Sequence, residues 1–311
     1  MNKKIIVGLI YGGKSVEHEA SKMTAASIRE NIDCRKFEVV EIYVDKKGKF
    51  KTDLLKTIKV AFLAWHGPNC EDGRFQKYLE RRKIKYIGSG PEASRINLDK
   101  NLQKKYFQKA GLQTVEFFAV NNKIPLREIN NKITNRFGYP CFIKPSNTGS
   151  SLGVAKCHCN SDLKEALKKA KRISRKIVVE QTIDNPREIE IAILGNRRLL
   201  ISEPGEILTH GKFYSYQAKY FKPFKTKTIA KNLTKKQIRQ IKTMAKKAYK
   251  ITDCRGFARI DFFLTPNNKI YINEINTLPG FTKISMFPKM IKAKGVKYKD
   301  LITIIINLAL K

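Results

Sequence analysis

Hydrophobic and polar residues alternate most regularly in two segments toward the C-terminus, RGFARIDFFL and KIYINEIN. Such alternation is typical of half-buried strands, and the residues between the segments, 265–268, favour a turn. Side chains two positions apart lie on the same face of a strand. Arg259 therefore shares a face with Asp261, and Glu274 shares a face with Asn276. If the strands pair in register, the hairpin brings two carboxylates, a carboxamide and a guanidinium to one patch.

The chemistry of this patch favours a metal site. Carboxylate and amide oxygens suit Mg²⁺, which binds proteins through one or two carboxylates together with waters and substrate phosphates. An arginine beside the metal indicates a reaction that develops negative charge. The alternative is an ordinary antiparallel hairpin whose polar face is exposed to water. The hairpin pattern alone leaves both interpretations open.

Apolar runs in the first third of the chain alternate with helical patterns. The runs at 5–11, 37–45, 60–67 and 85–90 predict strands. A βαβ rhythm of this kind predicts a parallel sheet with helices on its faces. We therefore expect an α/β protein whose N-terminal domain ends near residue 95.

The middle of the chain predicts a basic helix at 94–110 and, further on, a hairpin. A strand that ends at Lys144 is followed by NTGSSLG, residues 147–153, and then by a return strand. Small hydroxyl residues and glycines let backbone N–H groups approach a phosphate closely, and a nearby lysine adds positive charge. We call residues 147–153 the flap, because such a loop can close over a phosphate. An ordinary hairpin turn stays the alternative.

The remainder of the chain adds further helices and strands. Helices are predicted at 161–173 and 235–250, and strands at 177–183 and 187–196. Residues 203–221 form a long polar and aromatic loop, and loops of this length are commonly functional lids. The final segment, KYKDLITIIINLALK, predicts a helix that packs on the body of the protein.

Residues 8–15 spell G-x-x-x-x-G-K-S, the pattern of a phosphate-cradling loop. That motif needs a complete strand before its first glycine, and residues 5–11 are better explained as one strand that runs through Gly8. A basic P-loop protein that binds nucleic acid is kept as an alternative. Glu17, near the start of the following helix, is a candidate for holding an amine.

The net charge is unusual. The chain has 311 residues, with 63 Lys+Arg against 27 Asp+Glu and a formal net charge of +36. Such an excess attracts nucleic acid, anionic lipid or acidic substrates. The lysines are spread along the whole chain, however, and no aromatic and basic binding motif stands out. We therefore expect no specific nucleic-acid partner.

The sequence lacks recognisable targeting signals, which favours a cytoplasmic protein. No apolar run reaches the ~20 residues that span a bilayer, so no membrane segment is expected. The N-terminal stretch lacks the small-residue cleavage pattern of a signal peptide. The six cysteines are then expected to be free thiols. Cys157 and Cys159 flank His158, but strand alternation puts this histidine on the opposite face, and no second CxxC pair completes a zinc site.

The segments taken in order resemble the D-alanine–D-alanine ligases of the ATP-grasp superfamily. The resemblance rests on GGKSVEHEAS, HGPNCEDGRFQKYLE, GSGPEASRINLDK, KPSNTGSSLGV, EIEIAILGN, FYSYQAKY, RIDFF and NEINTLPGFTKISMFPKM. It implies an N-terminal parallel α/β domain, residues 1–95, followed by two α+β ATP-grasp subdomains, residues 96–185 and 186–311, that grip ATP between them. It also implies that residues 203–221 are the lid.

The same resemblance implies residues for the metal and the nucleotide. Two magnesium ions, with manganese as a substitute, would bind Asp261, Glu274 and Asn276. The residues implied for ATP are Lys100, Lys144, Lys219 and Ser151 at the phosphates, Glu180 at the adenine and Glu188 at the ribose.

A second set of residues is implied for the amino-acid substrates. Its members are Glu17 at the ammonium of the first D-alanine, Ser285 at the carboxylate of the second, Arg259 and the Gly280 N–H at the oxyanion, and Tyr220 and Ser150, which complete a hydrogen-bond network with Glu17. Related ligases that make D-alanyl-D-lactate carry a histidine in place of the lid tyrosine. Tyr220 is therefore similar to the dipeptide-forming type.

The reaction implied is the ATP-dependent ligation of two D-alanines through an acyl phosphate, for peptidoglycan precursor synthesis. A ligase that accepts D-serine or D-lactate, and a degenerate, inactive ligase fold, are the alternatives. The chain departs from the family pattern at Cys70, Lys77 and Lys14, none of which is assigned to metal or phosphate. The family also implies a homodimer.

Overall fold

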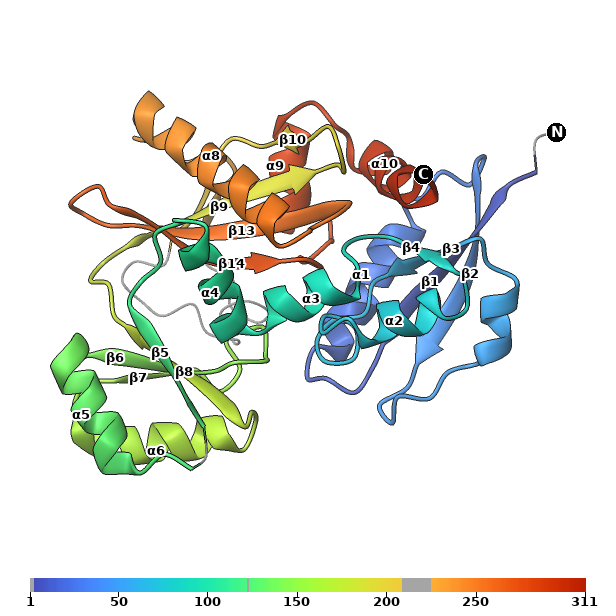
Figure 1. Ribbon diagram of the computed structural model, residues 1–311. Helices are drawn as coiled ribbons and strands as arrows, with labels where there is room; N and C mark the ends of the chain where they lie inside the picture. The colour runs from blue at the N-terminus through green and yellow to red at the C-terminus, as the bar shows by residue number, and fades with distance from the viewer. Residues whose placement is uncertain (1–2, 122, 209–224) are drawn as a thin grey trace.

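The N-terminal part of the chain is a parallel sheet. The computed structural model describes residues 3–121, 123–208 and 225–311, and its strands lie in separate sheets (Figure 1). The first sheet has the order β2-β1-β3-β4. Its elements are β1 (Ile5–Gly12), α1 (His18–Arg29), β2 (Phe37–Val44), a 3-10 helix η1 (Thr52–Lys56), β3 (Val60–Leu63), α2 (Arg74–Glu80) and β4 (Lys85–Tyr86). All three strand pairs are parallel, which confirms the βαβ prediction.

Gly8 lies inside β1 rather than in a loop. It pairs with Val40 on one side and Ala61 on the other. A Cβ at this position would lie 2.6 Å from the Ile58 side chain, so the glycine serves close packing. The P-loop alternative is therefore wrong, because its first glycine must follow a strand.

The predicted basic helix at 94–110 is two helices, α3 (Pro91–Leu98) and α4 (Lys100–Lys109). The break falls at Asp99, whose backbone is extended and whose carboxylate accepts hydrogen bonds from the amides of Asn101 and Leu102. An aspartate in this position caps a new helix. The prediction of one helix was wrong because the basic pattern runs across this cap.

The central sheet is antiparallel and has the order β5-β8-β6-β7. Its elements are β5 (Phe117–Asn121), α5 (Leu126–Arg136), β6 (Cys141–Pro145), β7 (Ala155–Cys157), α6 (Asn160–Lys171) and β8 (Lys176–Gln181). The sequence pattern predicts no element over 111–138, so β5 and α5 are additions. The flap connects β6 to β7 as predicted.

The third sheet contains the hairpin with the candidate metal ligands. Its order is β12-β11-β9-β13-β14, with β10 paired to β9. Its elements are β9 (Arg187–Leu194), β10 (Leu200–Ile201), β11 (Gly205–Ile207), β12 (Thr226–Lys227), α8 (Lys235–Ile251), β13 (Phe257–Leu264), β14 (Ile270–Asn276), α9 (Met286–Ala293) and α10 (Tyr298–Leu310).

The predicted lid loop, residues 203–221, is corrected at its start. Gly205–Ile207 forms β11, which pairs with β9. A Cβ on Gly205 would lie 2.6 Å from the Met286 side chain, so this segment is packed closely against α9. Residues 209–221 of the predicted lid lie outside the described residues.

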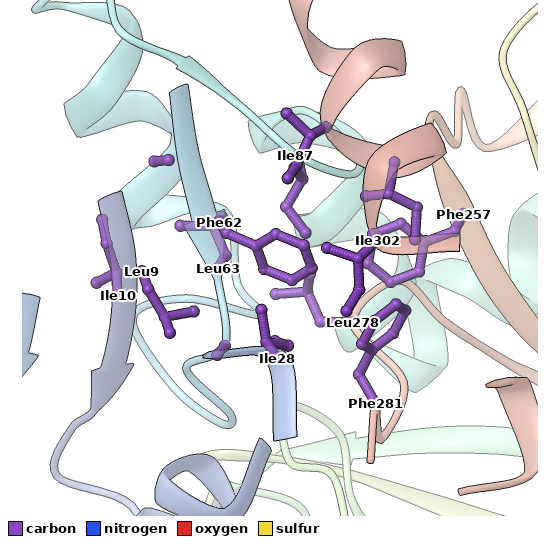
Figure 2. Close-up of a cluster of buried hydrophobic side chains, with 14 of the residues drawn as sticks. Leu9, Ile10, Ile28, Phe62, Leu63, Ile87, Phe257, Leu278, Phe281 and Ile302 are labelled. Carbon is purple, nitrogen blue, oxygen red and sulfur yellow. The ribbon is translucent and has the colours of Figure 1, made fainter. Parts of the chain in front are cut away.

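One hydrophobic cluster joins the N-terminal sheet to the C-terminal helices. Phe281 lies in the loop before α9, and its ring centroid is 5.7 Å from that of Phe62 in β3 and 5.7 Å from that of Phe257 in β13. Figure 2 shows these rings packed together beside Leu278 and Ile302. The predicted packing of the last helix on the body is confirmed, since its apolar face belongs to this cluster.

None of the helices in the described ranges is both long enough and apolar enough to cross a membrane.

Replacing Phe281 with alanine should lower the free energy of unfolding by about 3–5 kcal/mol, because the substitution opens a cavity where three elements meet. Denaturant unfolding measures the loss. Ile284→Ala is the matched control, since Ile284 lies in the same loop and is 72% exposed. The control should change the free energy of unfolding by no more than about 0.5 kcal/mol. Equal effects of the two substitutions would contradict the role given to Phe281.

Candidate active site

A cleft lies between the flap and the face of the third sheet. Its lining residues come from α4, β6, the flap and the residue that follows it, β9, β13 and β14. They are Lys100, Lys144, Gly149, Ser150, Ser151, Val154, Glu188, Ile189, Glu190, Arg259, Asp261, Phe262, Phe263, Asn273 and Glu274. The structure thus brings together candidate residues that are far apart in the sequence.

The two strands of the hairpin pair in the register that the predicted polar patch requires. Arg259 pairs with Asn276, and Asp261 pairs with Glu274. On the other edge of β13, Asp261 pairs with Glu190 of β9. Three carboxylates therefore lie in a row across three neighbouring strands. Like charges placed directly opposite one another destabilise a sheet, so this row requires positive charge beside it.

Arg259 supplies part of that charge. Its Nε and Nη2 atoms donate to the two carboxylate oxygens of Asp261, both at 2.7 Å. Its Nε also lies 3.1 Å from Oε1 of Glu190. A bidentate arginine–carboxylate pair is strong and fixes the plane of the guanidinium. Arg259 is therefore held in one orientation over the row of carboxylates.

Glu190 was not predicted as a site residue. A signal for it is present in the sequence, because Glu188 and Glu190 are two residues apart on β9 and so share a face. Of these two residues, the resemblance implies a role for Glu188 only. The side chain of Glu190 is 6% exposed, so the ion pair with Arg259 is largely shielded from water.

The oxygen donors on this face fit magnesium. Asp261 and Glu274 are cross-strand neighbours, and the Asn276 amide lies 3.0 Å from Asp261. In the described part of the chain, no group of three or more His, Cys, Asp or Glu side chains could hold a metal by itself. An ion at Asp261 and Glu274 would therefore also need the Asn276 oxygen, waters or phosphate oxygens, as Mg²⁺ commonly does.

Lys100 connects this face to the flap. Its ammonium donates to the Thr148 carbonyl at 2.5 Å and lies 3.8 Å from the Glu274 carboxylate. Its side chain is 14% exposed. The lysine therefore lies where a phosphate between the flap and the hairpin would meet it.

Lys144 contacts a buried carboxylate behind the cleft. Its ammonium lies 2.5 Å from Glu180, whose other oxygen is 3.3 Å from the ammonium of Lys104. Burial by itself raises the pKa of Glu180, but the two lysines outweigh it and lower the pKa to about 2. Burial is also the main reason why the pKa of Lys104 is lowered. Glu180 is absent from the cleft lining, and its expected contact with adenine stays a prediction.

Lys104 was not found from sequence. It lies on α4 and is 1% exposed. A lysine in a basic helix is normally assigned to the solvent face, so the pattern hides it. The only available signal is its position three residues before the buried Phe107.

The flap reaches the N-terminal part of the chain. The Ser150 hydroxyl donates a hydrogen bond to the Glu17 carboxylate. Ser150 and Ser151 both have positive φ angles, 52° and 57°, which are uncommon for residues other than glycine. The structure thus places Ser150 and Glu17 together, while Tyr220 and Lys219 lie outside the described residues.

His66 lies close to Glu17 and beyond β3, which ends at Leu63 and is shorter than the predicted strand at 60–67. Its ring nitrogens lie 3.1 Å from the Thr24 hydroxyl and 3.7 Å from Glu71. Burial alone lowers the pKa of His66, but hydrogen bonding to Glu71 and the charges of Glu71 and Glu17 raise it above its usual value. The carboxylates of Glu71 and Glu17 therefore favour the protonated form of His66.

Gly280 and Ser285 lie in the loop between β14 and α9, and neither is among the residues that line the cleft. The Ser285 hydroxyl accepts from the Thr282 amide at 3.1 Å. A Cβ on Gly280 would lie 3.2 Å from that hydroxyl. The Tyr298 hydroxyl donates to the Phe281 carbonyl at 2.5 Å, which anchors the loop to α10.

Comparison with known proteins places the chain in a family. A sequence model of the D-Ala-D-Ala ligase C-terminus matches residues 106–307, and one of the N-terminus matches residues 6–56. The chain belongs to the D-alanine–D-alanine ligase family. The resemblance inferred from the motifs is therefore confirmed, and so is the expectation of an enzyme of the ligase class.

Relatives of this family match over nearly the full length. A D-alanine–D-alanine ligase of Geobacillus thermodenitrificans is 39% identical, with 99% of this chain and 96% of the relative covered. The structure of a Bacillus anthracis D-alanine–D-alanine ligase complexed with ATP has 29% identity and a TM-score of 0.84, covering 98% and 97% of the two chains. A D-Ala:D-Ser ligase of Enterococcus faecalis has 27% identity and a TM-score of 0.88, covering 99% and 100%. These matches confirm the α/β class with an ATP-grasp fold.

The Lys104–Glu180–Lys144 cluster can be tested by Lys104→Met. This substitution should lower the free energy of unfolding at neutral pH by about 1–3 kcal/mol, because Glu180 stays buried and loses one of its partners. The exposed neighbour Lys105 provides the control, and Lys105→Met should leave stability nearly unchanged. Chemical denaturation of the three proteins gives the comparison.

The same cluster predicts a dependence on pH. The pKa of Glu180 falls from 4.5 to about 2 on folding, so its stabilising contribution is present above pH 4.5 and is lost as the pH falls toward 2. Lys104→Met should raise this pKa and make the loss smaller. Identical acid-unfolding profiles of the wild type and the variant would show that Lys104 does not set the ionisation of Glu180.

Proposed function

We propose that this chain joins two molecules of D-alanine to give D-alanyl-D-alanine, with ATP converted to ADP and phosphate, as a step of peptidoglycan precursor synthesis. The observation that carries the proposal is the cleft itself. It places a row of carboxylates with an arginine opposite a serine-rich flap, and lysines line the space between them. Family membership supports the same reaction.

ATP would bind with its phosphates between the flap and the hairpin. Lys100 and Lys144 would neutralise phosphate oxygens, and Ser151 would approach them from the flap. Lys219, which belongs to the predicted lid, would add a third cation. The ribose would lie at Glu188 and the adenine at Glu180, where the buried lysines fix the orientation of the carboxylate.

The metal requirement follows from the donors on the hairpin. Asp261, Glu274 and Asn276 would hold two Mg²⁺ ions, or Mn²⁺ in their place. Bound there, the ions would neutralise charge on the phosphates and on the transferred phosphoryl group. Because Arg259 engages both oxygens of Asp261, metal binding would require this arginine to shift toward Glu190 or toward the substrate.

The first half of the reaction activates a carboxylate, which is a poor electrophile. The carboxylate of the first D-alanine would attack the γ-phosphoryl group of ATP to give an acyl phosphate, and ADP would leave. Glu17 would hold the ammonium of this D-alanine. The hydrogen bond from Ser150 orients the Glu17 carboxylate, and it would join the flap to this amino-acid site.

In the second half, the amine of the second D-alanine would attack the acyl carbonyl, and phosphate would leave. The tetrahedral oxyanion would be stabilised by Arg259 and the Gly280 N–H. Ser285 would bind the carboxylate of the acceptor. Water would hydrolyse the acyl phosphate, so the flap and the lid with Tyr220 would have to exclude it.

The finer organisation is part of the proposal. The division at residues 95 and 185, a cytoplasmic location, a homodimer, and D-alanine and ATP rather than nucleic acid as partners are carried forward from the sequence. The three separate sheets support the division, because the first lies before residue 95 and the second between 117 and 181.

Phosphate release from Mg-ATP tests the reaction. Release should depend on D-alanine, with L-alanine as the control, and the dipeptide should be found in the product by mass spectrometry. Asp261→Asn and Glu274→Gln should each lower the rate by at least about 100-fold, because each weakens the stabilisation of phosphate charge. Lys14→Ala is the matched control, since Lys14 is exposed outside the cleft. Phosphate release without any amino acid, or only with nucleic acid, would overturn the proposal.

A second candidate function differs only in the acceptor. The likeness to a D-Ala:D-Ser ligase favours testing D-serine. With equal concentrations of D-alanine, D-serine and D-lactate, we expect D-alanyl-D-alanine to be the main product, because the predicted lid carries tyrosine. If D-alanyl-D-serine or the depsipeptide were the main product, the proposed acceptor would be wrong, whereas the proposed reaction class would stand.

A further inference from the structure

Cys141 and Cys157 are directly opposite one another at the base of the flap. Cys141 begins β6, Cys157 ends β7, and the two residues are cross-strand partners in the antiparallel register. Cα atoms of such partners are about 4.5–5.5 Å apart. That range lies inside the roughly 4.4–6.8 Å that a disulfide spans. The backbone is therefore already in position for a bond between the two sulfur atoms.

The two side chains also interact as thiols. Both are fully buried in the core of the central part, and their sulfur atoms are hydrogen-bonded to each other. The bond from the Cys141 thiol lowers the pKa of Cys157, whereas the pKa of Cys141 is raised. Cys157 is thus the better nucleophile, because the thiolate is the form that attacks a disulfide.

None of the other four cysteines has this arrangement. Cys34 and Cys159 are exposed. Cys70 and Cys254 are buried, and burial is the main reason why the pKa of each thiol is raised. A raised pKa makes a thiol a poorer attacking group in disulfide exchange, so neither would begin it. Among the six cysteines, Cys141 and Cys157 are the pair that faces each other on neighbouring strands, and Cys157 is the member whose pKa is lowered.

The position of β7 gives a route for an oxidant. It is an edge strand of three residues, and among the described strands β6 is its only neighbour. Short edge strands open locally at low free-energy cost, which exposes groups that are buried in the average structure. Cys157 at the end of this strand can therefore meet a small molecule without global unfolding.

We propose that Cys141 and Cys157 form a redox site, which closes reversibly to a disulfide across the base of the flap when the chain meets a low-molecular-weight disulfide. The Cys157 thiol loses its proton to solvent, and the resulting thiolate attacks one sulfur of that disulfide and expels a thiolate. Cys141 then loses its proton and attacks the Cys157 sulfur, which expels the second thiolate. The protein gains one S–S bond, and the small disulfide is reduced to two thiols.

The consequence of this bond falls on the flap. It closes a loop over residues 142–156 and holds β7 against β6. The loop carries Ser150, which contacts Glu17, and Thr148, which contacts Lys100. Oxidation would restrict local opening of the flap stem, and a dithiol reductant would restore it. This inference stands on the cysteine geometry and does not depend on the identity of the amino acids joined.

The test treats the purified full-length chain with oxidised glutathione at neutral pH. Remaining thiols are blocked in denaturant with iodoacetamide, and the protein is then digested with trypsin. Cleavage after Lys156 separates the two cysteines, because Cys141 remains on the peptide ending AK and Cys157 begins CHCNSDLK. Since Cys159 shares the second peptide, the experiment is run in parallel on Cys159→Ser, which makes the linkage unambiguous.

We expect a linked peptide in both proteins, loss of iodoacetamide labelling at Cys141 and Cys157, and recovery of both labels after dithiothreitol. The melting temperature should rise by a few degrees on oxidation and return on reduction, because the bond restricts the unfolded chain. Cys34→Ser should behave as the wild type does. Cys157→Ala should show no rise in melting temperature.

Two results would overturn the proposal. One is mixed disulfide with glutathione at Cys34 and Cys159 while Cys141 and Cys157 remain fully labelled. The other is a linkage that disappears in Cys159→Ser, which would assign the bond to Cys159. Both readouts use proteins that retain Cys141 and Cys157, so they do not depend on whether Cys157→Ala folds.

Discussion

The pairing of β13 with β9 on one side and β14 on the other is the constraint on which the site depends. This register aligns Glu190, Asp261 and Glu274 across three strands. A shift by one residue on any strand would send its carboxylate to the opposite face, toward the core. Three adjacent carboxylates cost free energy, and Arg259 offsets part of that cost. The three carboxylates therefore favour the binding of additional cations even in the absence of a ligand.

A second charge cluster lies behind the cleft, and there two lysines surround one carboxylate. Lys104 and Lys144 surround a single carboxylate, Glu180, which is almost completely buried. Removing charged side chains from water costs free energy. A buried cluster of this kind therefore serves to hold its side chains in position rather than to raise the stability of the fold. Most of the excess positive charge of the chain is on exposed side chains. Lys104, in contrast, lies in the interior, and Lys144 lies in the wall of the cleft.

The sequence predicted the parts of the structure in which polarity follows a simple period. The polar face of the hairpin followed from the alternation around Arg259 and Asp261, and the parallel N-terminal sheet followed from its apolar runs. Prediction was less successful where polar groups are buried. Lys104 and Glu190 look like surface residues, Asp99 looks like part of one basic helix, and residues 111–138 have no clear period. Contacts with residues distant in the sequence determine the structure at each of these positions, and a local sequence pattern carries no information about such contacts.

The shared cluster around Phe62 and Phe281 has a consequence for synthesis of the chain. Side chains of β1 and β3 complete their core with Leu301, Ile302, Ile305 and Ile306 of α10. The ribosome makes the N-terminal sheet first, yet the helix that covers it emerges almost 240 residues after β3. During that interval part of the apolar surface of the sheet has no native partner. Chaperone binding to the nascent chain would therefore be concentrated on the segment made first, until α10 has emerged.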